Sequence, residues 1–151
     1  MKKYIFYIIF LLLLNSCNDN KIDNRYQLTI ERFDKFFYES TSNDLFDLKK
    51  DYPFLFPEHY DNKVWINRLN DSVQKEIYSE VNLIFSNLDN EKKEIQSFYK
   101  NFTFYFPKYE LPRVITLISD VEYENRVILA DSLLLIGLDN YLGSDHPFYS
   151  S

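Results

Sequence analysis

The chain has 151 residues, with 17 basic and 23 acidic side chains and a net charge of −6. This excess of acid argues against a surface that binds nucleic acid or anionic lipid. Aromatic residues make up 19% of the chain and hydrophobic residues 46%, which excludes a disordered protein and indicates a core rich in Phe and Tyr. A single cysteine excludes a disulfide within one chain.

The N-terminus has the parts of a secretory signal. Lys2 and Lys3 precede an unbroken apolar run at residues 4–14, and small polar residues then lead to Cys17. As a helix this run would rise about 16 Å. The hydrocarbon core of a bilayer is about 30 Å thick, so the run is too short for a membrane-spanning helix.

The sequence around the cysteine resembles a bacterial lipoprotein signal. Leu14, Ser16 and Cys17 fit the lipobox pattern of such signals. We therefore predict that residues 1–16 are removed, that Cys17 is lipidated, and that residues 17–25 form a flexible tether. The alternative is an ordinary secretory signal with a coincidental cysteine, but a lone free thiol is unusual in an exported protein.

The first half of the mature chain has the period of helices. A short stretch at residues 26–30 alternates apolar and polar side chains and predicts an edge strand. Four helices are then expected, the first beginning near Ser42 and ending at Pro53. The other three are predicted at residues 61–69, 72–87 and 90–105.

The two longest predicted helices each carry an apolar stripe. In the first of them Asp71 and Gln74 have the spacing of a capping box. Its stripe consists of Val73, Ile77, Val81, Ile84, Phe85 and Leu88. The stripe of the helix at 90–105, which Pro107 ends, consists of Ile95, Phe98, Tyr99, Phe102 and Phe106.

The period changes to that of strands after residue 112. Residues 113–118 are β-branched and apolar on both faces, as in a covered central strand. Two further strands are predicted at 126–130 and 133–138, joined by a tight turn at Asp131 and Ser132. We therefore predict a single α+β domain at residues 26–151, with N-terminal helices packed on a small C-terminal sheet of about three strands.

Few residues have the spacing of a catalytic or metal site. The chain contains no H-E-x-x-H, P-loop, G-x-G-x-x-G or G-x-S-x-G motif. After the last strand, Asp139, Asp145 and His146 are weak candidates for a divalent cation site. The favoured alternative is a structural loop in which Gly143 supplies a left-handed turn and Asp145 caps local amides. We predict no cofactor, no metal and no enzymatic activity.

Two other polar positions are interpreted as structural. His59 follows Pro57 and is expected at the surface. Arg32 and Asp34 flank Phe33, and they are expected to form a salt-bridged structural junction. The alternative for this pair is part of a surface that binds a partner.

Several segments together resemble the gliding-motility lipoprotein GldB family of Bacteroidota. They are residues 30–34, 48–57, 104–107 and 114–116, with Trp65, and above all residues 135–149. The resemblance implies an exported, lipid-anchored lipoprotein of the cell envelope, held to a membrane through Cys17. It also implies a non-enzymatic component of the gliding machinery, bound up with type IX secretion and with protein partners in the envelope.

Members of this family are roughly twice as long as this chain, which resembles their N-terminal half. We therefore expect a truncated domain with an unpaired sheet edge, which is prone to incorrect pairing. Two alternatives follow from the resemblance: half of a degenerate zincin-like peptidase, or a non-functional gene fragment. No zinc ligand can be carried over, because nothing here matches the zinc motif of those peptidases.

Overall fold

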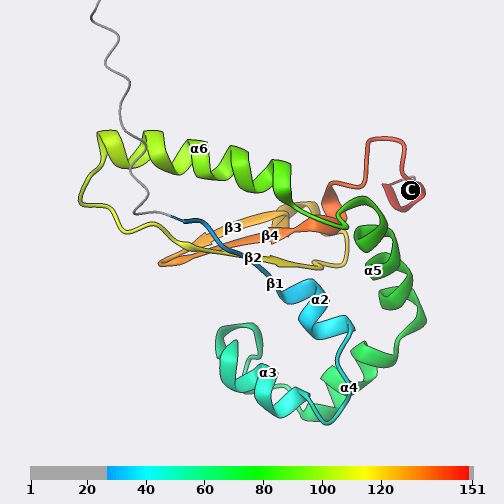
Figure 1. Ribbon diagram of the computed structural model, residues 1–151. Helices are drawn as coiled ribbons and strands as arrows, with labels where there is room; N and C mark the ends of the chain where they lie inside the picture. Colours follow the sequence, from blue (N-terminus) through cyan, green and yellow to red (C-terminus); the bar gives the residue numbers. More distant parts are fainter. Residues whose placement is uncertain (1–26, 150–151) are drawn as a thin grey trace, which may run out of the picture.

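The computed structural model describes residues 27–149, and the predicted signal, tether and lipidated cysteine lie outside this range. Its centre is a four-stranded sheet with the order β1-β2-β4-β3 (Figure 1). The strands β1, β2 and β4 are parallel, and β3 is antiparallel to β4. Their bounds are Ile30–Arg32 for β1, Arg113–Leu117 for β2, Val127–Ala130 for β3 and Leu133–Gly137 for β4.

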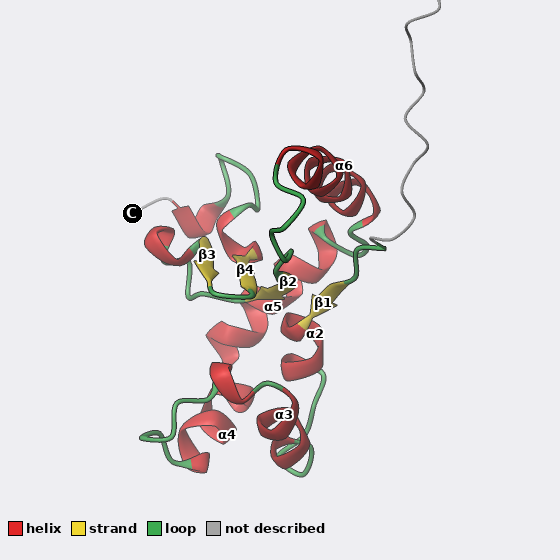
Figure 2. Cartoon of the chain, turned by 90° about the vertical axis from the view of Figure 1, so that its left-hand side faces the viewer, coloured by secondary structure: helices red, strands yellow, loops and turns green. Residues whose placement is uncertain are grey.

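Helices cover the sheet from both faces. Figures 1 and 2 show α6 alone over one face, α2, α3 and α4 on the opposite side, and α5 beside the carboxyl ends of the strands. The bounds are Phe33–Tyr38 for α2, Leu45–Asp51 for α3, Asn62–Asn70 for α4, Ser72–Ile84 for α5 and Asp89–Tyr105 for α6. The predicted α+β class is therefore confirmed.

The sheet has four strands rather than the predicted three, because β1 joins it beside β2. The edge position expected for residues 26–30 is right, but the strand itself covers Ile30–Arg32. Its bounds are set by pairing with a strand more than 80 residues away, Ile30 opposite Val114 and Arg32 opposite Thr116. Local alternation of side chains does not contain that information.

The predicted central strand is confirmed. β2 lies between β1 and β4, and Val114, Ile115 and Thr116 are each 1% exposed or less. The predicted hairpin is also present, since β3 and β4 pair across Asp131 and Ser132. Asp131 has a φ of +47°, a turn conformation that aspartate tolerates better than most residues do.

The helix boundaries differ from prediction where tertiary contacts intervene. α2 was not predicted, because six residues with no side-chain cap give too little periodic signal. α3 begins at Leu45, not near Ser42, because the Asp44 carboxylate accepts hydrogen bonds from the backbone and hydroxyl of Thr41. α5 ends at Ile84 instead of residue 87, and the carbonyl of the next residue is bound by Arg32.

Two side-chain predictions on the long helices are half right. Asp71 caps α5 by accepting from the amides of residues 73 and 74, but Gln74 does not close the capping box. Its side chain binds Tyr38 and Asp120 instead. On α6, Tyr99 packs against the sheet as expected, whereas other members of the predicted stripe remain exposed.

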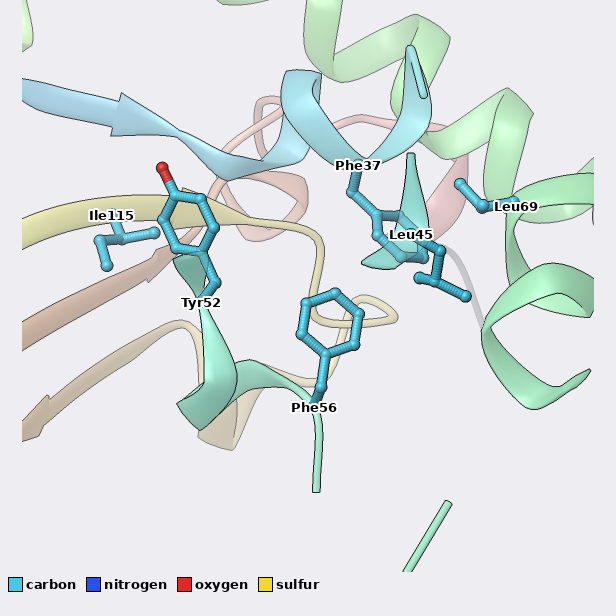
Figure 3. Packing of buried hydrophobic residues seen from close by; sticks show 6 residues of the cluster. All are labelled: Phe37, Leu45, Tyr52, Phe56, Leu69 and Ile115. Atoms are coloured by element: carbon cyan, nitrogen blue, oxygen red, sulfur yellow. The ribbon is translucent and has the colours of Figure 1, made fainter. Parts of the chain in front are cut away.

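The largest core cluster lies between the sheet and helices α2, α3 and α4. Figure 3 shows its six buried members, Phe37, Leu45, Tyr52, Phe56, Leu69 and Ile115. Trp65 packs edge-on against Phe56 with ring centroids 4.8 Å apart, and its ring closes the cluster from the side of α4. Aromatic residues thus fill the core, as the composition predicts. Within residues 27–149, no helix has the length and apolar character needed to cross a bilayer.

Candidate functional site

Polar side chains collect at the carboxyl ends of the three parallel strands. Asp34 follows β1, Ser119 and Asp120 follow β2, and Asp139 and Asn140 follow β4. Parallel strands bring their carboxyl ends to one edge of a sheet, and this edge is where open sheets of this kind usually bind ligands. We therefore take this edge as the candidate site.

At the end of β1, Arg32 and Asp34 form a closed network. The guanidinium donates to both Asp34 oxygens, with its shortest bond at 2.6 Å, and donates to the Phe85 carbonyl at 2.7 Å. The Thr116 hydroxyl donates to the same carboxylate, which is completely buried. The predicted salt-bridged junction is confirmed, and it ties β1, β2 and the end of α5 together.

At the end of β4, Asp139 braces the loop that follows β2. Its buried carboxylate accepts the amide N–H of Ser119 at 2.9 Å and that of Val121 at 2.6 Å, and the Ser119 hydroxyl at 3.1 Å. The Asn140 amide donates to the same hydroxyl at 2.7 Å. A Cβ at Gly137 would lie 2.5 Å from the Ser119 oxygen, so this close approach requires glycine.

The braced loop holds an unfavourable backbone conformation. Asp120 and Val121 have φ values of +63° and +59°, and a β-branched residue in this region is an outlier. Such a conformation costs on the order of 1–3 kcal/mol and persists only where the surroundings impose it. Here the hydrogen bonds that Ser119 and Val121 donate to Asp139 impose it.

Asp120 faces outward into a second network. Arg68 donates to both of its oxygens at 3.0 and 2.6 Å, and Gln74 donates at 2.6 Å. Burial alone would raise the pKa of Asp120, but the hydrogen bonds from Arg68 and Gln74 outweigh it and hold this pKa below its usual value. Tyr38 donates to the Gln74 carbonyl oxygen at 2.6 Å, and burial raises the pKa of Tyr38 to about 12.

The raised pKa of Tyr38 predicts that the protein loses stability in alkaline solution. A pKa raised from 10.0 to about 12 means that the folded state favours the neutral phenol, so the stabilisation is complete below pH 10 and is lost as pH rises toward 12. Between pH 9 and 11 we expect the free energy of unfolding to fall by about 1 kcal/mol more in the wild type than in Tyr38→Phe. Urea titrations followed by circular dichroism measure this difference. Tyr123→Phe, an exposed matched control, should retain the wild-type loss, and an equal loss in Tyr38→Phe would refute the assignment.

An open hollow of about 630 Å³ lies beside the loop that Asp139 holds at residues 119–121. Its lining carries no charged side chain and consists of Val121, Tyr123, Asn140, Tyr141, Gly143, Ser144, Phe148 and Tyr149. The Tyr149 hydroxyl donates to the Asp139 carbonyl at 2.7 Å and accepts from the Leu142 amide at 2.8 Å, which closes the loop on itself. Gly143 has a φ of +111°, as expected for a left-handed turn.

The structure does not assemble the weak metal candidates into a ligand set. Asp139 is occupied by the brace, Asp145 is exposed beside Ser144, and His146 packs on Phe148 with ring centroids 4.6 Å apart. His146 Nδ1 accepts the Phe148 amide at 3.3 Å, and Nε2 lies 3.5 Å from Glu80. Among residues 27–149, no three His, Cys, Asp or Glu side chains lie together as metal ligands would.

The remaining sequence candidates lie apart from this edge. His59 is at the surface, as expected, with its ring 4.1 Å from that of Tyr60. Sequence reasoning missed Thr116, Ser119 and Asp120. The available signal was their position at the end of the predicted central strand, which points to the carboxyl edge once the parallel pairing is known.

Together these features define a small α+β protein whose buried polar groups brace the ends of its parallel strands. The family model described as "Gliding motility protein GldB" matches residues 15–151. The chain therefore belongs to the GldB family, as its sequence segments suggest, and is associated with gliding motility and the cell envelope. No curated protein and no solved structure matches the chain.

Proposed function

We propose that the protein is a lipid-anchored, non-enzymatic component of the gliding machinery, associated with type IX secretion and exported from the cytoplasm. The observation that carries the proposal is the extent of the family match, which begins at Asn15 and so includes Cys17. In this proposal residues 1–16 are the cleaved signal, Cys17 carries the lipid, and residues 17–25 tether the body to a membrane of the envelope.

The candidate site supports a structural role over a catalytic one. A general acid or base needs a free lone pair or proton within reach of a substrate. The two buried carboxylates, Asp34 and Asp139, instead accept hydrogen bonds from within the chain. These bonds join segments that are far apart in sequence. Such cross-links are expected in a rigid scaffold that presents surfaces to partners.

Cys17→Ser in the native gene tests the anchor. We expect the variant to lose incorporation of labelled palmitate and to accumulate as the uncleaved precursor, and we expect its colonies to spread no further than those of a gene deletion. Asn20→Ser, a change to the same residue type in the predicted tether, is the matched control and should retain both labelling and spreading. Normal spreading of a clean deletion would overturn the proposed function. Labelling of Cys17→Ser would overturn the anchor.

A further inference from the structure

We propose that the C-terminal end of α6 is a second membrane contact, in which exposed aromatic rings lie in the headgroup region beside the lipid anchor. This inference rests on the proposed lipidation of Cys17. The α6 aromatic patch consists of Phe98, Phe102, Phe104, Tyr105, Phe106 and Tyr109.

Three consecutive aromatic side chains at the end of α6 are largely exposed to solvent. Phe104 is 71% exposed, Tyr105 is 73% exposed and Phe106 is 56% exposed. Phe102 lies at the centre of a ring cluster, with its centroid 4.7 Å from that of Phe106 and 5.0 Å from that of Tyr109. Contiguous exposed apolar surface of this kind marks a site of interaction with a protein or a membrane.

The start of the described chain lies at this end of the molecule. Leu28 packs in one cluster with Tyr99 of α6 and with Leu111, which follows the helix. Figure 1 shows the chain entering the body below the yellow-green end of α6, and Figure 2 shows the same proximity from the side. A tether that begins at Cys17 therefore brings the patch toward the membrane that holds the lipid.

The length of the tether favours this orientation. Nine residues lie between Cys17 and Gln27. The ten steps from one to the other span about 35 Å in a fully extended chain. A compact body of this size has a diameter of about 35 Å. The opposite end of the molecule, which carries Tyr141 and the hollow, could reach the membrane only if the tether were almost fully extended.

Local charge fits a bilayer surface. No acidic residue lies between Glu94 and Glu110, although the chain as a whole has a net charge of −6. Lys100 and Lys108 flank the exposed rings, and cationic side chains beside aromatic ones are typical of segments that lie at membrane interfaces. The overall excess of acid thus does not extend to this segment of the chain.

The distribution of the rings distinguishes a bilayer from a protein groove. A helix that binds in a groove presents one stripe at positions i, i+3, i+4 and i+7. Here Phe104 and Tyr105, at the end of α6, and Phe106, which follows it, are consecutive residues that project in different directions and are all exposed. Exposed rings that point in several directions suit insertion of the helix end into a headgroup layer, where Tyr and other aromatic residues are favoured.

Depth-dependent fluorescence quenching tests the contact. Full-length lipidated protein carrying Tyr105→Trp is reconstituted into phosphatidylethanolamine and phosphatidylcholine vesicles whose acyl chains are brominated near the headgroup. We expect about a twofold loss of the added tryptophan emission relative to unbrominated vesicles. The matched variant Tyr123→Trp, at a tyrosine that is 70% exposed near the hollow, should lose none. The native Trp65 contributes the same background to both variants.

The outcomes separate this inference from the proposed function. Palmitate labelling and flotation with the vesicles are measured first on both variants. Absence of label would overturn the lipid anchor and, with it, the membrane contact. Labelled and floated protein with equal emission changes in the two variants would overturn the membrane contact alone, and the exposed rings would then be assigned to a protein partner.

Discussion

Asp34→Ala is expected to destabilise the protein by about 3–5 kcal/mol, the usual effect of removing one partner from a buried ion pair. The substitution leaves the Arg32 side chain, which is 13% exposed, and the Thr116 hydroxyl without their common acceptor. Domains of this size are stable by about 5–15 kcal/mol, so the change would remove a large share of the free energy of unfolding. Urea unfolding followed by circular dichroism measures the loss.

The strand β1, which precedes Asp34, supplies a control. Glu31 accepts two hydrogen bonds from Arg113, with the same pairing of carboxylate and guanidinium, but the Arg113 side chain is 49% exposed. Arg113 holds the pKa of Glu31 below its usual value, and water screens an exposed pair of this kind. Glu31→Gln should therefore cost less than about 1 kcal/mol. Equal losses in Asp34→Ala and Glu31→Gln would contradict the view that burial makes the Asp34 junction essential.

Helices whose ends carry local sequence signals could be predicted closely. The predicted helix at 61–69 became Asn62–Asn70, and the one at 90–105 became Asp89–Tyr105. Both are bounded by local signals, such as the Asp61 cap and Pro107. A helix depends on residues within one or two turns of one another, so its pattern is present in a single stretch of sequence.

The strand pairings are not local, and most of the candidate site depends on them. Residue 31 lies opposite residue 115, and residue 116 lies opposite residue 136. Nothing near Ser119 or Asp120 in the sequence indicates that Asp139 and Arg68 bind them. In the segment at 139–146, Gly143 has the left-handed conformation predicted for it, but the partners of the first carboxylate lie 18 to 20 residues away.

The stripe predicted on α6 shows a related limit. Periodicity placed Phe98, Tyr99 and Phe106 together as core residues, but only Tyr99 is buried. Hydrophobic spacing predicts which residues are apolar together, but it does not tell whether a protein core or another surface covers them. The exposed members of this stripe are the ones proposed above to contact the membrane.

Asp139→Asn is expected to cost about 2–4 kcal/mol, because a buried acceptor is replaced by a group that is partly a donor. The amide nitrogen of asparagine would face the N–H of Ser119 or Val121, which now donate to the carboxylate at 2.9 and 2.6 Å. Without the brace, the positive φ values of residues 120 and 121 lose their support. Faster amide hydrogen exchange at these positions, together with urea unfolding, measures the effect.

Asp145→Asn is the matched control, since it makes the same change at an exposed position of the same loop. It should alter the free energy of unfolding by no more than about 0.5 kcal/mol. Similar losses in the two variants would contradict the brace. Colony spreading then separates structure from chemistry at Asp139. If Asp139 only braces the loop, a second-site variant that restores stability to Asp139→Asn should restore spreading as well. If the carboxylate acts on a substrate, spreading would remain lost in a protein that is fully folded.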